Sequence, residues 1–155
     1  MVITERDAYY LDRAILLAEK AFEIDEVPVG SVVVENDSII ADGFNEKESF
    51  QDPLRHAEIV AMQRAAQYKN DWRLNNCLLY TTLEPCIMCC GAILHFRIKR
   101  VVFCLKEIKF GGVVSKAKIL DIQGLNHRVD YAYGYKEEYI KQLISTFFKS
   151  KRNNK

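Results

Sequence analysis

Three cysteines fall within five positions of the segment TLEPCIMCCGAI, residues 82–93. Cys86 and Cys89 form a C-x-x-C pair at the expected start of a helix, where both thiolates point the same way, towards a common ligand. The positive end of the helix dipole favours deprotonated sulfur at this place. Two protein ligands leave a zinc ion incomplete, and His56, at the start of the preceding predicted helix, is the third candidate. Three ligands leave a fourth position for water, as in catalytic zinc sites.

Glu58 stands two residues after His56, and 27 residues further on the chain reads Pro85-Cys86-x-x-Cys89. This combination is the signature of zinc nucleobase deaminases, in which zinc activates a water that attacks the ring carbon bearing the amino group. The Glu of the signature is not a ligand. It accepts the proton of the water, passes it to a ring nitrogen and protonates the departing ammonia. The sequence therefore predicts one Zn²⁺ per chain on His56, Cys86 and Cys89, with Glu58 as the catalytic acid and base.

The thiols have two non-catalytic alternatives: a closed structural zinc site that uses a further cysteine, or a thiol-containing core without metal. A fourth thiolate would displace the reactive water and leave Glu58 without a task. Cys90 is therefore predicted to be a small buried residue. Cys77 and Cys104 fall in predicted strands and are expected in the core.

Length and charge restrict the class of protein. A chain of 155 residues predicts one domain, 1–155. Because 22 Lys and Arg nearly balance 21 Asp and Glu, a nucleic-acid footprint would have to be local. No stretch approaches the roughly 18 apolar residues of a membrane span, and the N-terminus has no apolar signal region. We expect a reducing cytoplasm, where neighbouring cysteines indicate metal binding or catalysis.

Hydrophobic periodicity predicts alternating helices and strands. The expected helices cover 5–24, 56–69, the segment beginning EPCIMCC, the short KAKIL segment and 136–152; the expected strands cover 29–34, 39–43, 77–82, 100–105 and 129–134. The first two strands predict a hairpin, and the apolar run 77–82 predicts a central strand. The chain from 77 to 105 reads as a βαβ unit, and 44–55 reads as a polar loop. The predicted class is α/β, with helices on both faces of a central sheet.

Several segments, with Asn45, together resemble the bacterial tRNA-specific adenosine deaminases from about Asp7 to Arg152: PVGSVVV, HAEIVAM, LYTTLEPCIMCCGAI, RIKRVVF, NHRV and FFKSKR. The resemblance implies a cytidine-deaminase-like, three-layer α/β/α fold with a central five-stranded mixed sheet, usually in a homodimer. It implies conversion of adenosine to inosine at the wobble position of tRNA, with the anticodon stem-loop as partner. The zinc motifs are shared with cytidine, deoxycytidylate, guanine and riboflavin-pathway deaminases, whereas NHRV and the aromatic-basic ending are the discriminating pieces.

The resemblance also implies substrate contacts. Asn45 would hydrogen-bond the flipped purine, and Pro28 and Val29 would help to line its pocket. Judged by residue type alone, Asn45 in a polar loop is by default a turn residue. Phe148, Lys149 and Arg152 are the RNA contacts expected at the ending, although paired aromatics are more often core and a charged terminus is often simply solvated.

One loop departs from the family pattern. In the stretch 105–112, Lys106 and Glu107 stand where many relatives carry Arg and Asp, and a Lys lacks the planar fork of Arg. We expect this loop to lie beside the substrate backbone. Two rivals remain: a zinc deaminase of a small substrate, such as guanine or a cytosine nucleoside or nucleotide, and a non-catalytic RNA-binding protein with a structural zinc. His95 is expected on a helix surface, and His127 is expected to be structural or near the RNA.

Overall fold

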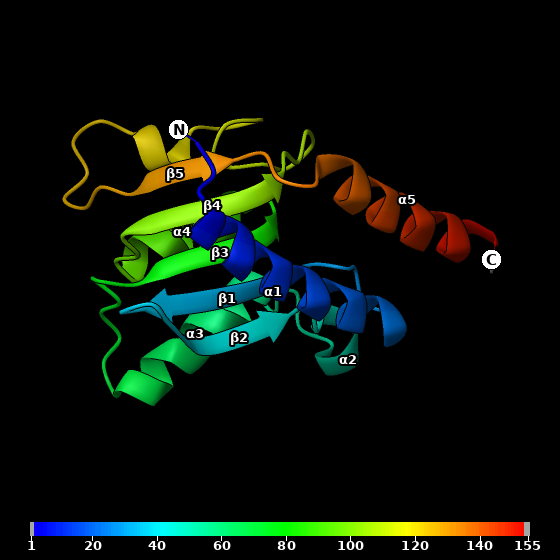
Figure 1. The fold of residues 1–155 in the computed structure, drawn as a ribbon, viewed down its shortest axis with the longest axis horizontal. Coiled ribbons are helices and arrows are strands. Elements are labelled where there is room, and N and C mark those ends of the chain that lie inside the picture. The colour runs from blue at the N-terminus through cyan, green and yellow to red at the C-terminus, as the bar shows by residue number, and fades with distance from the viewer. Residues whose placement is uncertain (1, 154–155) are drawn as a thin grey trace.

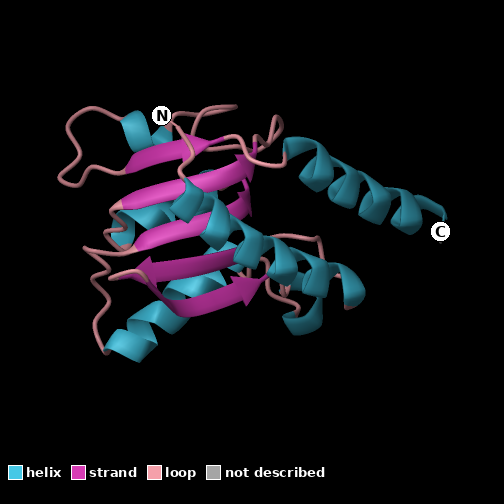
Figure 2. Ribbon diagram, in the orientation of Figure 1, coloured by secondary structure: helices cyan, strands magenta, loops and turns pink. Residues whose placement is uncertain are grey.

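Five strands form one mixed sheet in the order β2-β1-β3-β4-β5 in the computed structural model, which describes residues 2–153 (Figures 1 and 2). The strands are β1 (Gly30–Glu35), β2 (Ser38–Phe44), β3 (Leu78–Leu83), β4 (Arg100–Leu105) and β5 (Asp130–Tyr133). β1 runs antiparallel to both β2 and β3, whereas β3, β4 and β5 are parallel. The predicted hairpin, the central position of 77–82 and the βαβ unit are confirmed.

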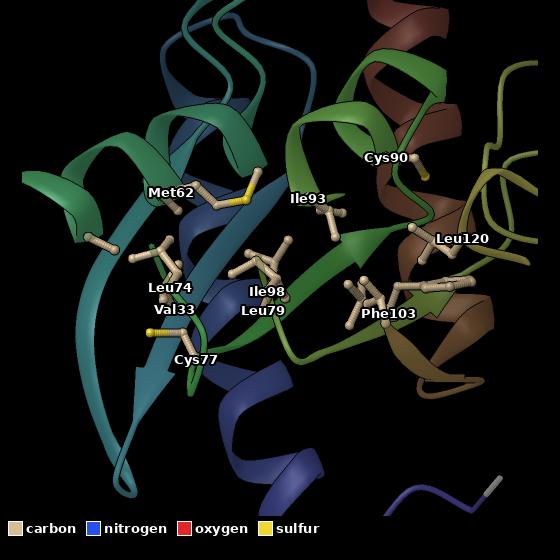
Figure 3. Close-up of a cluster of buried hydrophobic side chains, with 14 of the residues drawn as sticks. Val33, Met62, Leu74, Cys77, Leu79, Cys90, Ile93, Ile98, Phe103 and Leu120 are labelled. Carbon is tan, nitrogen blue, oxygen red and sulfur yellow. The ribbon is translucent and has the colours of Figure 1, made fainter. Parts of the chain in front are cut away.

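Helices cover both faces of the sheet, so the three-layer α/β/α prediction is confirmed (Figure 1). The helices are α1 (Glu5–Glu23), α2 (Lys47–Phe50), α3 (Ala57–Lys69), α4 (Ile87–His95) and α5 (Glu137–Asn153). Alternate strand residues face opposite cores because side chains alternate along a strand. Val33 and Phe103 pack with α3 and α4 (Figure 3), whereas Val32 and Val102 pack with α1 and the start of α5.

Helix α1 begins where the sequence predicts a start. The Thr4 side chain accepts from the backbone N–H of Asp7, and the Asp7 side chain accepts from that of Thr4, which completes a capping box. Its buried face lies directly on β1, since a Cβ on Gly30 would come within 2.1 Å of the Ala14 carbonyl oxygen. This close approach explains the glycine at the start of β1.

Two predicted segments differ from the structure. The stretch 44–55, predicted to be a loop, contains the short helix α2. The buried carboxylate of Glu26 holds α2 by accepting from the backbone N–H groups of Glu48 and Ser49, at 3.1 and 2.6 Å. The KAKIL segment, predicted to be a short helix, forms only a 3₁₀ turn, at Ile119–Asp121.

Helix α5 runs beside α1 and extends beyond the sheet (Figure 1). Polar and apolar contacts join this part of the chain to α1: the Tyr139 hydroxyl donates to Glu19, that of Tyr135, just before α5, donates to Asp12, and Phe147 packs on Phe22. No helix in the part of the chain that the structure describes combines the length and apolar character that a membrane crossing requires.

Candidate metal centre and active site

Three side chains of the right chemistry for zinc meet at the ends of two helices. His56 is the N-cap of α3 and Cys86 the N-cap of α4, and Cys89 lies in the first turn of α4. The Sγ atoms of Cys86 and Cys89 each lie 3.6 Å from His56 Nδ1. With Zn–S about 2.3 Å and Zn–N about 2.0–2.1 Å, tetrahedral geometry requires an S-to-N separation of about 3.6 Å. These three residues, called the metal triad below, therefore fit a zinc ion.

Neighbouring backbone fixes the cysteine ligands. β3 and β4 are parallel, and α4 connects them, so the start of α4 lies at the carboxyl end of β3. Cys86 forms a β-bridge with Gly111, and the Gly112 N–H donates to the Pro85 carbonyl at 2.8 Å. The residues after β4 thus hold the first cysteine ligand from the side opposite its helix.

Hydrogen bonds within the metal triad favour the thiolate form of Cys86. The Cys89 thiol donates to Cys86, and His56 adds a second hydrogen bond, so the Cys86 pKa falls to about 4 although burial opposes this. The same hydrogen bond, together with burial, raises the Cys89 pKa well above its usual range. The hydrogen bond to Cys86 also raises the His56 pKa. A thiolate beside two further soft donors is the set that a divalent zinc ion neutralises.

Glu58 lies in the first turn of α3 and is 4% exposed. Burial raises its pKa to about 6, although the nearby His56 acts in the opposite direction. A carboxyl group with a pKa near the working pH can both take and return a proton. Glu58 is therefore suited to proton transfer beside the metal triad.

A cavity of ≈ 390 Å³ opens on these groups. It is lined by residues from four separate stretches of chain: Val27, Val29, Asn45, Lys47, His56, Glu58, Leu83, Glu84, Cys86, Glu107 and Phe110. Its volume lies in the range of small-molecule sites. The mixture of apolar walls and a few polar groups is suited to one planar heterocycle.

Of the three residues expected to contact the purine, two line the cavity and one does not. Asn45 lines the cavity, and its Oδ1 accepts from the Ala57 N–H at 2.8 Å, which leaves its amide NH₂ as a donor. Val29 lines the cavity wall together with Val27, whereas Pro28 between them is buried and does not reach it.

Three polar cavity residues are not found by reasoning from the sequence. Lys47 stands on α2, in a stretch predicted to be a loop, and Glu84 lies between β3 and the cysteines. Glu107 stands out in the sequence only as a departure from the family pattern. The neighbouring Phe110 carries no signal at all, since an isolated aromatic in a loop has no periodicity to place it.

The C-terminal helix borders a second, neighbouring cavity. This groove of ≈ 690 Å³ shares Val27 and Lys47 with the first cavity and is also lined by Phe148 and Arg152. Phe147 is buried at 6% exposure and packs on Phe22, whereas Phe148 is 42% exposed. One phenylalanine is thus core and the other is available to a ligand.

Three cations follow on the last turns of α5, called the tail cations below: Lys149, Lys151 and Arg152. Lys151 pairs with Asp25. Lys149 and Arg152 are exposed. Lys151 and Arg152 line the groove together with Phe148, whereas Lys149 does not line it.

The remaining cysteines and histidines stay apart from the metal triad. Cys90 is fully buried, packs among apolar residues and has Sγ 3.6 Å from the Pro85 carbonyl oxygen (Figure 3). Cys77 and Cys104 are buried in the two cores. His127 lies 2.7 Å from the Ile98 carbonyl oxygen and fastens the loop before β5, whereas His95 is exposed at the end of α4.

Comparisons with known proteins agree with this geometry. The model of the cytidine and deoxycytidylate deaminase zinc-binding region matches residues 4–105. The tRNA-specific adenosine deaminase of Aquifex aeolicus is 46% identical over 146 residues, which is 94% of this chain and 96% of that protein. That of Haemophilus influenzae is 41% identical over 155 residues, 99% of this chain and 90% of that protein.

Solved structures of deaminases also resemble this chain. A structure from work on A-to-I editing by tRNA:A34 deaminases superposes with a TM-score of 0.84 at 32% identity, covering 88% of this chain and 99% of that one. Guanine deaminase from Nitrosomonas europaea has a TM-score of 0.78 over 95% of this chain and 86% of its own. Its identity of 21% shows a shared fold alone.

Proposed function

Because the chain belongs to the zinc-dependent cytidine and deoxycytidylate deaminases, and among them to the tRNA-specific adenosine deaminases, we propose that it deaminates adenosine to inosine at the wobble position of tRNA. The reaction consumes water and releases ammonia. The observation that carries the proposal is the metal triad, with zinc-compatible spacing, beside a buried carboxyl at the base of a cavity. One deaminase domain spans the chain.

Zinc, when held by His56, Cys86 and Cys89, supplies a Lewis acid that lowers the pKa of a water. Glu58 accepts a proton and delivers it to the ring nitrogen next to C6 of the purine. The same carboxyl then carries the second proton of the water to the amino group at C6, which leaves as ammonia, and the oxygen of the water stays on C6 as the carbonyl of inosine. Its raised pKa, about 6, suits this double use because neither protonation state is strongly preferred near neutral pH.

Substrate residues position the base and exclude water from it. The free NH₂ of Asn45 donates to an acceptor on the purine edge, since its oxygen is committed to Ala57. Val29, with Val27, packs on the face of the ring, and Pro28 supports this wall from the buried side. A flipped adenine is held in this way by one polar contact and one apolar wall.

RNA outside the cavity meets the groove beside α5. Phe148, 42% exposed, offers a face for stacking on a base, and Lys149 and Arg152 offer charge to the phosphates. A free nucleobase would need none of these groups. They favour the anticodon stem-loop over guanine or a cytosine nucleotide as substrate.

A homodimer and a cytoplasmic location complete the proposal. Large apolar side chains remain exposed near the cavity, at Phe50, Leu54 and Ile87, with exposures of 57%, 56% and 51%. A second copy of the chain would cover such surface. All five cysteines are free thiols, which suits the reducing cytoplasm where tRNA is found. Light scattering that gives the mass of a single chain would contradict the dimer.

The deciding experiment incubates the zinc-loaded protein with an anticodon stem-loop that carries adenosine at the wobble position. Guanine, cytidine and deoxycytidylate serve as parallel substrates, and product analysis by mass spectrometry detects each product. We expect inosine from the stem-loop alone. Activity confined to a small substrate would contradict the proposal.

Glu58→Ala provides the matched control for the chemistry. Because Glu58 is not a ligand, the variant should keep about one zinc per chain, as in the signature's other members. Its turnover should fall by roughly 10²–10⁴-fold, the usual contribution of a general acid–base group. Full activity in this variant would overturn the assigned proton transfer, and loss of zinc would assign Glu58 to the metal instead.

A further inference from the structure

Glu84 is a buried carboxylate that the chemistry does not use. It follows β3, is 2% exposed, and accepts five hydrogen bonds from one segment of chain. The donors are the backbone N–H groups of Glu107, Val113, Val114 and Ser115, at 3.0, 3.0, 2.8 and 3.0 Å, and the Ser115 hydroxyl. Five donors fill the acceptor capacity of a carboxylate.

These hydrogen bonds fasten both ends of the segment 107–115, here called the clamp loop. Glu107 is held at its start and Ser115 at its end. The loop passes so close to Glu84 that a Cβ on Gly111 would lie 2.4 Å from the Glu84 carboxyl carbon. A turn closes the middle, because the Gly111 N–H donates to the Glu107 carbonyl at 2.9 Å. The clamp loop is thus fastened at both ends and closed by a turn between them.

The clamp loop presents an aromatic side chain at the cavity mouth. Phe110 lines the cavity, yet 65% of it is exposed. Ile108, two residues earlier, is 67% exposed and does not line the cavity. The position of Phe110 at the cavity, where the target base would enter, gives the exposed ring a use, because nucleic-acid bases stack on such rings irrespective of sequence.

We propose that Phe110 is a stacking platform for the base that adjoins the deaminated adenosine in the RNA, and that Glu84 is the positioning residue that holds Phe110 in place. The inference rests on the proposed function, since it requires an RNA substrate. Fixing the ring before binding lowers the entropy lost when the base stacks, so a loosened loop binds more weakly. Glu84 acts on recognition through Phe110 and touches no reacting atom.

The direct test is Phe110→Ala, with Phe110→Tyr as the conservative variant and Ile108→Ala as the matched control in the same loop. Loss of one stacked base should raise the KM for the stem-loop by roughly 5- to 100-fold. Zinc content and kcat should stay close to those of the parent protein. Phe110→Tyr and Ile108→Ala should both behave like the parent. An unchanged KM in Phe110→Ala would overturn the proposal.

Modified substrates identify the base. Stem-loops with an abasic site on the 5′ or the 3′ side of the target adenosine remove one stacking partner at a time. On one of them, the parent protein and Phe110→Ala should show the same raised KM, because no base is left to stack. If Phe110→Ala remains worse than the parent on both abasic substrates, Phe110 does not stack on either neighbour.

The positioning role is tested by Glu84→Gln, whose amide NH₂ opposes the N–H donors of the clamp loop. This variant should raise KM, and adding Phe110→Ala to it should raise KM little further, since residues that act together are non-additive. If the two substitutions instead raise KM by factors that multiply in the double variant, Glu84 does not act through Phe110.

Should Glu84→Gln lose zinc, Ser115→Ala replaces it in the same comparison. This substitution removes one of the five hydrogen bonds to Glu84, at a position away from the metal triad. A parent protein that deaminates no stem-loop would refute the proposed function instead.

Discussion

Asp7 ties helix α1 to the centre of the sheet, and its replacement by asparagine should destabilise the protein in a pH-dependent way. The side chain accepts from Arg100 Nη1 and Nη2, at 2.8 and 3.1 Å, and from the Tyr80 hydroxyl at 2.8 Å. It also accepts from the Thr4 N–H at 3.1 Å. Because Tyr80 lies on β3 and Arg100 on β4, one carboxylate joins a helix and two strands.

The size of the effect follows from the Asp7 pKa. Burial raises this pKa, but the hydrogen bonds from Arg100, Thr4 and Tyr80 outweigh burial and lower it from 3.8 to about 2. Each pKa unit corresponds to about 1.4 kcal/mol, so the ionised group contributes about 2 kcal/mol to the free energy of unfolding. The folded pKa lies below the unfolded value. The contribution is therefore complete above pH 3.8 and disappears as the pH falls through 2.

Urea unfolding of Asp7→Asn and the parent protein, in the same metal state, measures this contribution. At pH 7 the difference should be about 2 kcal/mol, which is a fall in Tm of about 4–8 °C for a chain of this size. Below pH 2 the difference should become small. Asp37→Asn is the matched control: Asp37 pairs with Arg6 but is 67% exposed, and exposed pairs contribute little. Equal stability of Asp7→Asn and parent at pH 7, or a difference that does not change with pH, would contradict the role assigned to Asp7.

Two further predictions concern zinc and RNA. Alanine at either cysteine of the metal triad should release zinc and abolish turnover, whereas Cys90→Ala should keep both; metal analysis of the purified variants decides between these assignments. Alanine at all three tail cations should raise the KM for the stem-loop and leave zinc unchanged. It should also flatten the salt dependence of binding, by a slope of about 0.7 for each phosphate that the tail cations no longer bind. Unchanged kinetics across a salt series would assign the tail cations to the solvated surface.

The sheet and the metal triad are predictable from the sequence because both leave short, regular patterns. Alternation and apolar runs locate each strand, and the histidine and cysteines lie at the starts of helices that the sequence also predicts. The family resemblance adds the function. The residues alone indicate zinc and proton transfer but not the identity of the substrate.

Long-range contacts account for the features that the sequence does not predict. Helix α2 has four residues and no apolar period, and it forms because Glu26, 22 residues before Glu48, accepts from its first turn. That helix brings Lys47 to the cavity. Likewise, no local pattern tells which phenylalanine of the last helix is buried, because the neighbour that covers Phe147 lies far away on α1. Such features depend on tertiary packing, which periodicity does not encode.

The thin attachment of α5 should make it a cooperative unit separate from the sheet. Within Glu137–Asn153 only Ile140 and Phe147 are buried, Ile144 is partly buried, and exposed polar pairs join Tyr139 to Glu19 and Lys151 to Asp25. Few buried apolar contacts mean a low free energy of local opening, so α5 should detach in native-like conditions while the sheet stays folded. Its amides would then exchange hydrogen faster than those of β3 and β4. RNA that binds the groove would stabilise the docked helix and offset its ordering entropy, which couples substrate affinity to a local folding equilibrium.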